Sequence, residues 1–147
     1  MIKLPNPDKD CKIPERLKAD NWAFHVMARS EDPAYKCQNI GNLVNNLVAT
    51  LSMAGLLETE INHTIMTTTK IKGEVVPKPR FFRTLDEFMK YQIRGANESW
   101  NLYTHGEKGA AVEVAAAVLR EVLFLVYDER FTTVDTKTSF YGRGEKP

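Results

Sequence analysis

The stretch 107–130 reads EKGAAVEVAAAVLREVLFLVYDER, and it decides the fold that we expect for this chain. Between residues 110 and 127 only Glu113, Arg120 and Glu121 are charged. An ordinary surface helix shows a single apolar stripe, so this composition predicts a helix that is buried on most of its circumference. Three charges interrupt a run that is already short for a bilayer, so we do not expect a membrane span.

The composition indicates one globular domain over residues 1–147. Hydrophobic residues make up 43% and charged residues 27%, which argues against a disordered or collagen-like chain. Lysine and arginine number 20 against 19 acidic residues, so the formal net charge of +1 favours neither nucleic acid nor a membrane. Cys11 and Cys37 match no metal or redox spacing, and the N-terminal residues contain no apolar run for a signal peptide. We therefore expect a cytoplasmic protein.

Local signals predict two helices in the first half of the chain. Apolar residues in 15–29 are spaced alternately by three and four, which indicates a short amphipathic helix. Asp32 and Pro33 are a typical helix start, with aspartate as the cap and proline at the first helical position. The helical period that follows continues to about Ile65, and then threonine and β-branched residues favour an extended or hairpin excursion. Whether 64–80 is strand or helix stays open.

A further helix begins after Thr84, because the sequence TLDE at 84–87 is a capping box. Phe81 or Phe82 lies just upstream, where one of them could pack on Phe88 as a hydrophobic staple. Prolines make residues 1–14 an extended N-terminal arm, and 131–147 is a C-terminal tail. The predicted fold is mostly α: a helical bundle of three to four main helices with extended N- and C-terminal arms, and a small β excursion near 64–80 as the open possibility.

Three acidic residues of the central stretch are the candidate catalytic set. Glu113, Glu121 and Asp128 fall within a sector of roughly 80° on a helix. Carboxylates on a mostly apolar helix must be paired, bind a metal or face solvent, because burying them alone costs several kcal/mol. All-α nucleotide pyrophosphohydrolases hold magnesium with clustered helical acids, but their Glu-x-x-Glu and Glu-x-x-Asp spacings are missing here. We favour an exposed edge, with Arg120 and Arg130 beside the acids.

Glu60 and His63 are the candidate metal ligands, since Glu-x-x-His places a carboxylate and an imidazole on one helical face. Di-iron bundles contain this pair twice, whereas it occurs once here. A solvated helix end is therefore the favoured interpretation, and we expect no metal.

The stretch 70–94 is the candidate nucleic-acid surface. Its seven basic residues outnumber the acidic Glu74, Asp86 and Glu87, for a local balance of 7 − 3 = +4. Aromatic residues are interleaved, which is typical of a surface that follows a phosphate backbone and stacks bases. An ordinary exposed segment leading into a helix would have the same composition. The basic residues are Lys70, Lys72, Lys78, Arg80, Arg83, Lys90 and Arg94.

Catalytic templates are missing from the sequence. There is no Gly-x-Ser-x-Gly, phosphate-binding glycine loop or dinucleotide fingerprint. We therefore favour a non-enzymatic binding or assembly protein that acts through protein–protein surfaces: a small subunit, an adaptor, or a phage-type accessory or inhibitor protein. The expected partner is another protein or a second copy of the chain, because so small a bundle cannot cover all of its apolar surface.

Two alternatives stay open. One is an all-α, metal-dependent nucleotide phosphohydrolase with Mg as its cofactor, built on Glu113, Glu121 and Asp128. The other is a nucleic-acid-binding module that uses the basic stretch 70–94.

Overall fold

The computed structural model describes residues 13–126, and it is mostly helical with one small antiparallel sheet. The elements in chain order are α1 (Pro14–Arg29), α2 (Pro33–Met53), β1 (Glu60–Ile71), β2 (Glu74–Thr84), α3 (Leu85–Thr104) and α4 (Lys108–Leu125). The mostly helical prediction is confirmed. The predicted C-terminal tail and residues 1–12 of the predicted N-terminal arm lie outside the described residues, as does Asp128. No helix within 13–126 has the length and apolar character needed to cross a membrane.

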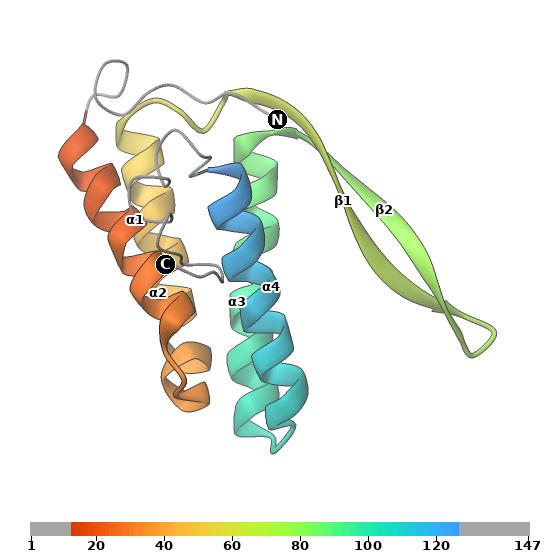
Figure 1. The fold of residues 1–147 in the computed structure, drawn as a ribbon. Helices are drawn as coiled ribbons and strands as arrows, with labels where there is room; N and C mark the ends of the chain where they lie inside the picture. The colour runs from red at the N-terminus through yellow and green to blue at the C-terminus, as the bar shows by residue number, and fades with distance from the viewer. Residues whose placement is uncertain (1–12, 127–147) are drawn as a thin grey trace.

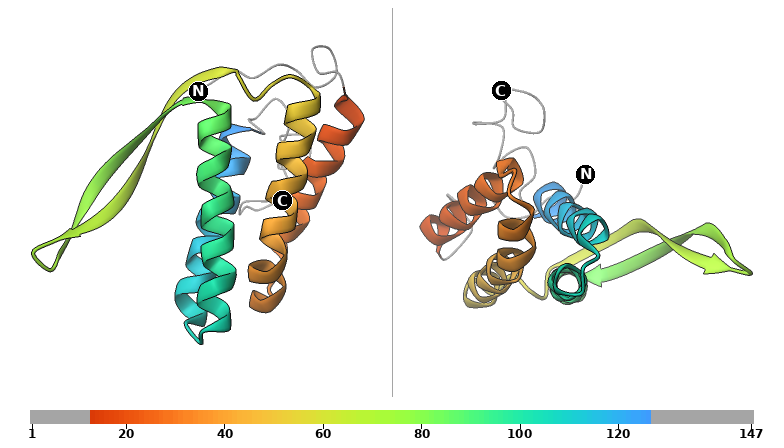
Figure 2. Two further views of the ribbon diagram at one scale, coloured as in Figure 1. Left: turned by 180° about the vertical axis from the view of Figure 1, so that it is seen from behind. Right: turned by 90° about the horizontal axis from the view of Figure 1, so that it is seen from below.

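The helices stand side by side, and α3 and α4 form the closest pair (Figures 1 and 2). α2 packs against α3 and also contacts α1 and α4, and α1 contacts α4 as well. Between these helices lies a core that includes Phe24, Met27, Ile40, Leu47, Leu51, Leu85, Phe88, Met89, Val122 and Leu123, all 2% exposed or less.

The central helix exists as predicted, but its exposed side is wider than the sequence indicates. α4 buries Ala111, Ala115, Val118, Leu119, Val122, Leu123 and Leu125. Phe124 is 55% exposed although it is apolar, and Glu113 and Arg120 lie on the same exposed side. Among the described elements, α4 packs mainly against α3 and also contacts α2 and α1.

Two of the predicted helix starts are confirmed by their hydrogen bonds. The Asp32 carboxylate accepts from the backbone N–H groups of Ala34 and Tyr35, at 3.1 and 3.3 Å. At α3 the Glu87 N–H donates to the Thr84 hydroxyl at 3.3 Å, and the Thr84 N–H donates to the Glu87 carboxylate at 3.4 Å. Both arrangements satisfy N–H groups that a helix leaves without intrahelical partners.

The region after α2 differs most from the prediction. The helix ends at Met53 rather than near Ile65, and Gly55 takes a left-handed φ of +74°. Such a residue commonly terminates a helix because it bears no Cβ. The predicted excursion at 64–80 is instead a longer hairpin, with β1 starting at Glu60 and β2 ending at Thr84. Its turn has positive φ at Lys72 and Gly73, which matches the twist of a two-residue hairpin loop.

The hairpin projects away from the helices (Figures 1 and 2). Only its base is buried, where Ile61, Ile65 and Phe82 are 4%, 9% and 4% exposed. The Phe82 ring meets Phe88 edge-on, with centroids 5.6 Å apart, so this phenylalanine packs as the sequence predicts for one of the pair. A lone two-stranded hairpin is marginally stable in water. The base contacts therefore hold the hairpin in place.

A charge in the core side of α4 should unfold the protein. We expect Val122→Asp and Leu123→Asp to lower the free energy of unfolding by about 4 kcal/mol or more, because each buries an unpaired carboxylate. Urea denaturation followed by circular dichroism measures the change. Ala110→Asp, at an exposed position of the same helix, is the control and should change stability little. Core variants as stable as the control would contradict the assignment of this helix.

Two helical glycines should respond in opposite ways to alanine. A Cβ at Gly41 would meet nothing within 4 Å, so Gly41→Ala should stabilise the protein by about 1 kcal/mol through helix propensity. A Cβ at Gly95 would lie 2.9 Å from Cγ2 of Val118. The steric strain of this contact should destabilise the protein by more than the higher helix propensity of alanine stabilises it. Thermal unfolding should therefore rank Gly41→Ala above the parent and Gly95→Ala below it. Gly95→Ala as stable as Gly41→Ala would contradict a close contact between α3 and α4.

Candidate functional site

The structure does not bring the predicted acidic set together within the described residues. Glu113 and Glu121 both lie on α4, but eight residues of helix separate them by about 12 Å. Glu113 is exposed, whereas Glu121 is half-buried and accepts a hydrogen bond from Nε2 of Gln92 at 2.9 Å. Within residues 13–126, no three or more histidine, cysteine, aspartate or glutamate side chains are grouped to hold a metal ion.

Glu60 and His63 lie on a strand, so their predicted placement on one helical face is wrong. The Glu60 carboxylate pairs with the Arg83 guanidinium at 3.1 Å, and both side chains are exposed. The His63 ring lies 6.0 Å from the ring of Phe88 and 6.3 Å from that of Phe124, centroid to centroid. Burial there lowers the pKa of His63. The two residues therefore have separate partners.

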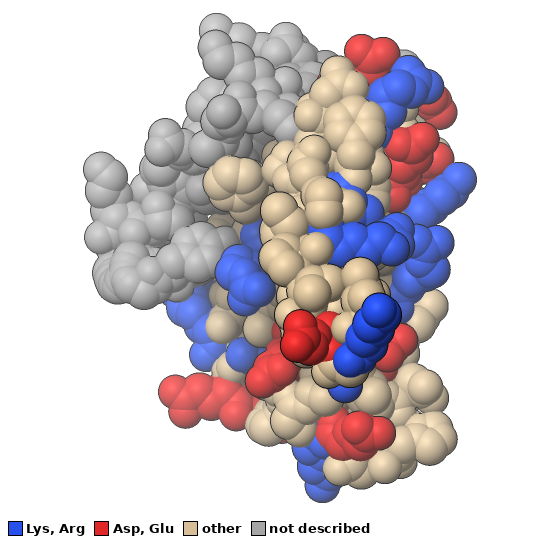
Figure 3. Space-filling view, turned by 90° about the vertical axis from the view of Figure 1, so that its right-hand side faces the viewer, with Lys and Arg blue, Asp and Glu red and all other residues tan. Residues whose placement is uncertain are grey.

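The basic stretch is spread over three elements. Arg83 and Lys90 form ion pairs with Glu60 and Asp86, at 3.1 and 3.0 Å. Figure 3 shows the lysine and arginine side chains of this face with acidic side chains above and below them.

The five other basic side chains of the stretch differ in their surroundings. Arg80 and Arg94 lie over the Tyr91 ring, 5.0 and 5.9 Å from its centroid. Lys70, Lys72 and Lys78 are exposed on the hairpin, and they are three of the five basic residues of the stretch for which no ion pair forms among the described residues.

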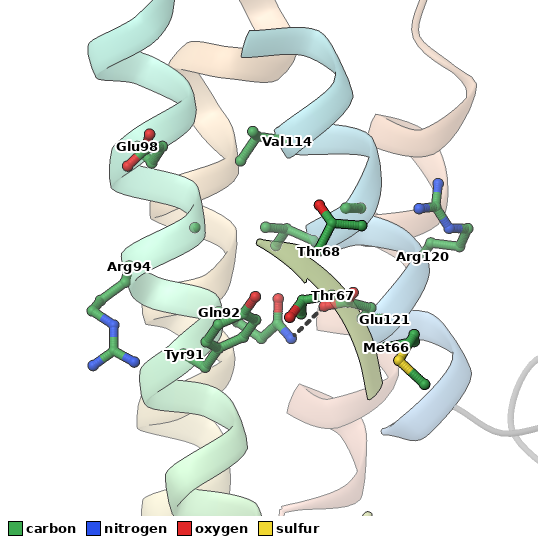
Figure 4. A pocket seen from close by; sticks show the side chains of 13 residues that line it. Met66, Thr67, Thr68, Tyr91, Gln92, Arg94, Glu98, Val114, Arg120 and Glu121 are labelled. Atoms are coloured by element: carbon green, nitrogen blue, oxygen red, sulfur yellow. Dashed lines mark hydrogen bonds between the residues drawn. The ribbon is translucent and has the colours of Figure 1, made fainter. Parts of the chain in front are cut away.

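A groove of about 840 Å³ lies between β1 and the paired helices α3 and α4 (Figure 4). Ligand pockets commonly span about 300–1,000 Å³, so its size suits a ligand or a short chain segment. The lining residues are Met66, Thr67 and Thr68 of β1, Tyr91, Gln92, Arg94, Gly95 and Glu98 of α3, and Val114, Ala117, Val118, Arg120 and Glu121 of α4. We refer to this space as the groove.

The floor of the groove forms where the two helices come close together. Gly95 has no side chain, and the ideal position of a Cβ there is only 2.9 Å from Cγ2 of Val118. Ala117 is the neighbouring small residue on α4. The small side chains leave room above them, and the hairpin forms the opposite wall with Met66 and Thr68 (Figure 4).

Gln92 and Glu121 are the polar pair inside the groove. Gln92 is 0% exposed, and its Nε2 donates to Oε1 of Glu121 (Figure 4). The other amide atom, Oε1 of Gln92, is buried without a hydrogen-bond partner among the described residues. Burial raises the pKa of Glu121, while the Gln92 hydrogen bond and the charge of Arg120 act in the opposite direction. The pair therefore presents two acceptor groups in a partly desolvated site.

Sequence reasoning singled out Glu121 but not its partner. Gln92 lies 29 positions away on another helix, so no local spacing connects the two residues. The sequence indicates Gln92 only in that a glutamine occupies a position of the helical repeat that is otherwise apolar. Protein-family models, curated proteins and solved structures were compared with the chain, and none of them matches it.

The raised pKa of Glu121 predicts a pH dependence of stability. Folding favours the protonated carboxyl, so this group stabilises the protein at low pH and the contribution is lost as the pH rises from 4.5 through the folded pKa. We expect Glu121→Gln to raise the midpoint of thermal unfolding at pH 8 more than at pH 4. The control is Glu113→Gln, an exposed carboxylate of the same helix. Equal effects of both variants at every pH would contradict the assignment.

Proposed function

We propose that this chain is a non-enzymatic binding or assembly protein, in which a helical bundle carries the β1–β2 hairpin as its docking element. One observation carries the proposal: the hairpin leaves the helices and exposes an apolar face. Phe81, Met66 and Val75 are 59%, 66% and 63% exposed. Large apolar side chains at such fractions are typical of surfaces that another protein covers.

The register of the hairpin supports one continuous surface. Thr64 pairs with Phe81, Met66 with Pro79 and Lys70 with Val75, and directly paired residues share a face of the sheet. Alternation along each strand then gathers these residues on the face opposite to Ile65. We call it the outer face, made of Thr64, Met66, Thr68, Lys70, Val75, Pro77, Pro79 and Phe81.

The composition of the outer face suits a protein partner better than nucleic acid. Methionine and aromatic residues are enriched at protein interfaces, and lysine is depleted there. Lys70 is the single charged member of the outer face. Of the basic stretch, Arg83 and Lys90 are neutralised by carboxylates. These placements favour assembly through the hairpin over binding along a phosphate backbone.

The phosphohydrolase alternative has less support than the proposed binding function. Glu113 faces solvent and Glu121 is bonded to Gln92, so the two carboxylates do not face each other across a cleft. A magnesium site needs converging oxygen ligands.

The test compares the assembly state of matched surface variants. We expect the parent to sediment at a multiple of 16.7 kDa or in a complex with a protein from its source. Replacing Phe81 and Val75 together with serine should release the chain as a monomer with unchanged circular dichroism. Trp22→Ser, which removes a similarly exposed (57%) aromatic ring from α1, should leave the assembly intact. A parent that sediments as a lone monomer at micromolar concentration, with no partner recovered, would overturn the proposal.

A further inference from the structure

The two edges of the hairpin differ in their capacity to add a strand. β2 contains Pro77 and Pro79, which pair with Thr68 and Met66. Proline has no N–H, so within a sheet its nitrogen faces the outer edge of the strand. The outer edge of β2 therefore lacks two donors. β1 contains no proline, and within residues 13–126 its outer edge has no strand partner.

The register also identifies the backbone groups at the open edge of β1. In an antiparallel ladder, pairs that exchange two hydrogen bonds alternate with pairs that exchange none. Since Pro77 and Pro79 occupy the second kind of pair, Thr68 and Met66 do too, and their N–H and C=O groups face outward. Both residues line the groove. The open edge of β1 is thus one wall of the groove.

The opposite wall presents a buried acceptor that nothing in the described chain satisfies. Oε1 of Gln92 has no hydrogen-bond partner among the described residues, and leaving a buried carbonyl oxygen unpaired destabilises the folded state. The Glu121 carboxylate lies beside it, held by the same amide at 2.9 Å. A group that carries several N–H donors and a positive charge would satisfy both oxygens at once.

The arginines at the groove do not supply this group. Arg94 and Arg120 point away from Gln92 in Figure 4, and the Arg94 guanidinium lies over Tyr91. A guanidinium from outside fits the site, because its planar fork of N–H groups can contact a carboxylate and an amide oxygen together. Its aliphatic stem would lie on Val114, Ala117 and Gly95, which also line the groove.

We propose that the groove binds an extended segment of a partner protein, which adds as a strand to the open edge of β1 and inserts an arginine side chain toward Gln92 and Glu121. This inference rests on the proposed function and gives the partner its chemistry. Main-chain hydrogen bonds to Met66 and Thr68 provide the affinity of such strand addition, and the side-chain site provides the specificity. Arginine flanked by β-branched residues is the expected sequence of the segment.

The first test measures the arginine preference. The probes are the acetylated and amidated peptide Thr-Val-Thr-Arg-Thr-Val-Thr and the same peptide with neutral citrulline in place of arginine. Calorimetric titration into the full chain should show the arginine peptide binding about tenfold more tightly, the effect of a charge-assisted contact. Glu121→Gln should abolish the difference. Glu113→Gln, on the same helix outside the groove, should preserve it.

The second test measures strand addition. Thr68→Pro removes the outward N–H and should weaken the arginine peptide about tenfold or more, while Thr68→Val keeps the N–H and the affinity. The hairpin should survive Thr68→Pro, since this N–H is not used between β1 and β2, and the circular dichroism spectrum checks it.

Three results would overturn the inference: no binding at millimolar peptide, equal affinity for the arginine and citrulline peptides, or full affinity in Thr68→Pro. These peptide results are independent of whether the double serine variant at Phe81 and Val75 becomes a monomer. Failure of the groove can therefore be told apart from failure of the docking hairpin.

Discussion

The junction between the hairpin and α3 is the constraint on which the remaining structure depends. The Thr84 capping box fixes the residue at which β2 becomes α3. The N–H groups of Leu85 and Asp86 donate to the carbonyls of Thr59 and Leu57, at 2.9 and 2.8 Å, so the chain entering β1 is tied to the chain leaving β2. Both ends of the hairpin are thereby anchored to one helix start, and its direction relative to α3 and α4 is set. The groove exists because that direction leaves a space beside the helices.

A single polar pair in an apolar helix contact gives the groove its chemistry. α3 and α4 approach closely at Gly95 and Val118, in a contact between helices that is otherwise largely apolar. Gln92 and Glu121 instead place an amide and a carboxylate there, with one hydrogen bond between them. Burial raises the pKa of the Glu121 carboxyl, so the charged carboxylate lowers the free energy of unfolding relative to an apolar pair at this position. A carboxyl whose pKa is perturbed inside a cleft is a candidate for a functional site.

The sequence predicts the elements whose signals are local, and misses those that depend on distant residues. Asp32 with Pro33, and Thr84 with Glu87, begin helices through hydrogen bonds within a few positions. The end of α2 was misplaced because Ile61 and Ile65 are four apart, a spacing that fits one face of a helix and equally one face of a strand. The pair of Gln92 and Glu121 could not be predicted, because helix packing alone brings them together.

An open strand edge is a hazard for a folded protein, since it can pair with any exposed strand. The two edges of the hairpin differ. Pro77 and Pro79 remove N–H donors from the outer edge of β2, whereas the open edge of β1 lies beside α3 and α4. Met66 and Thr68 are backed by Gln92, Gly95 and Ala117 across the groove. The same helices that line the groove beside β1 also supply the polar pair to which we assign recognition of the arginine.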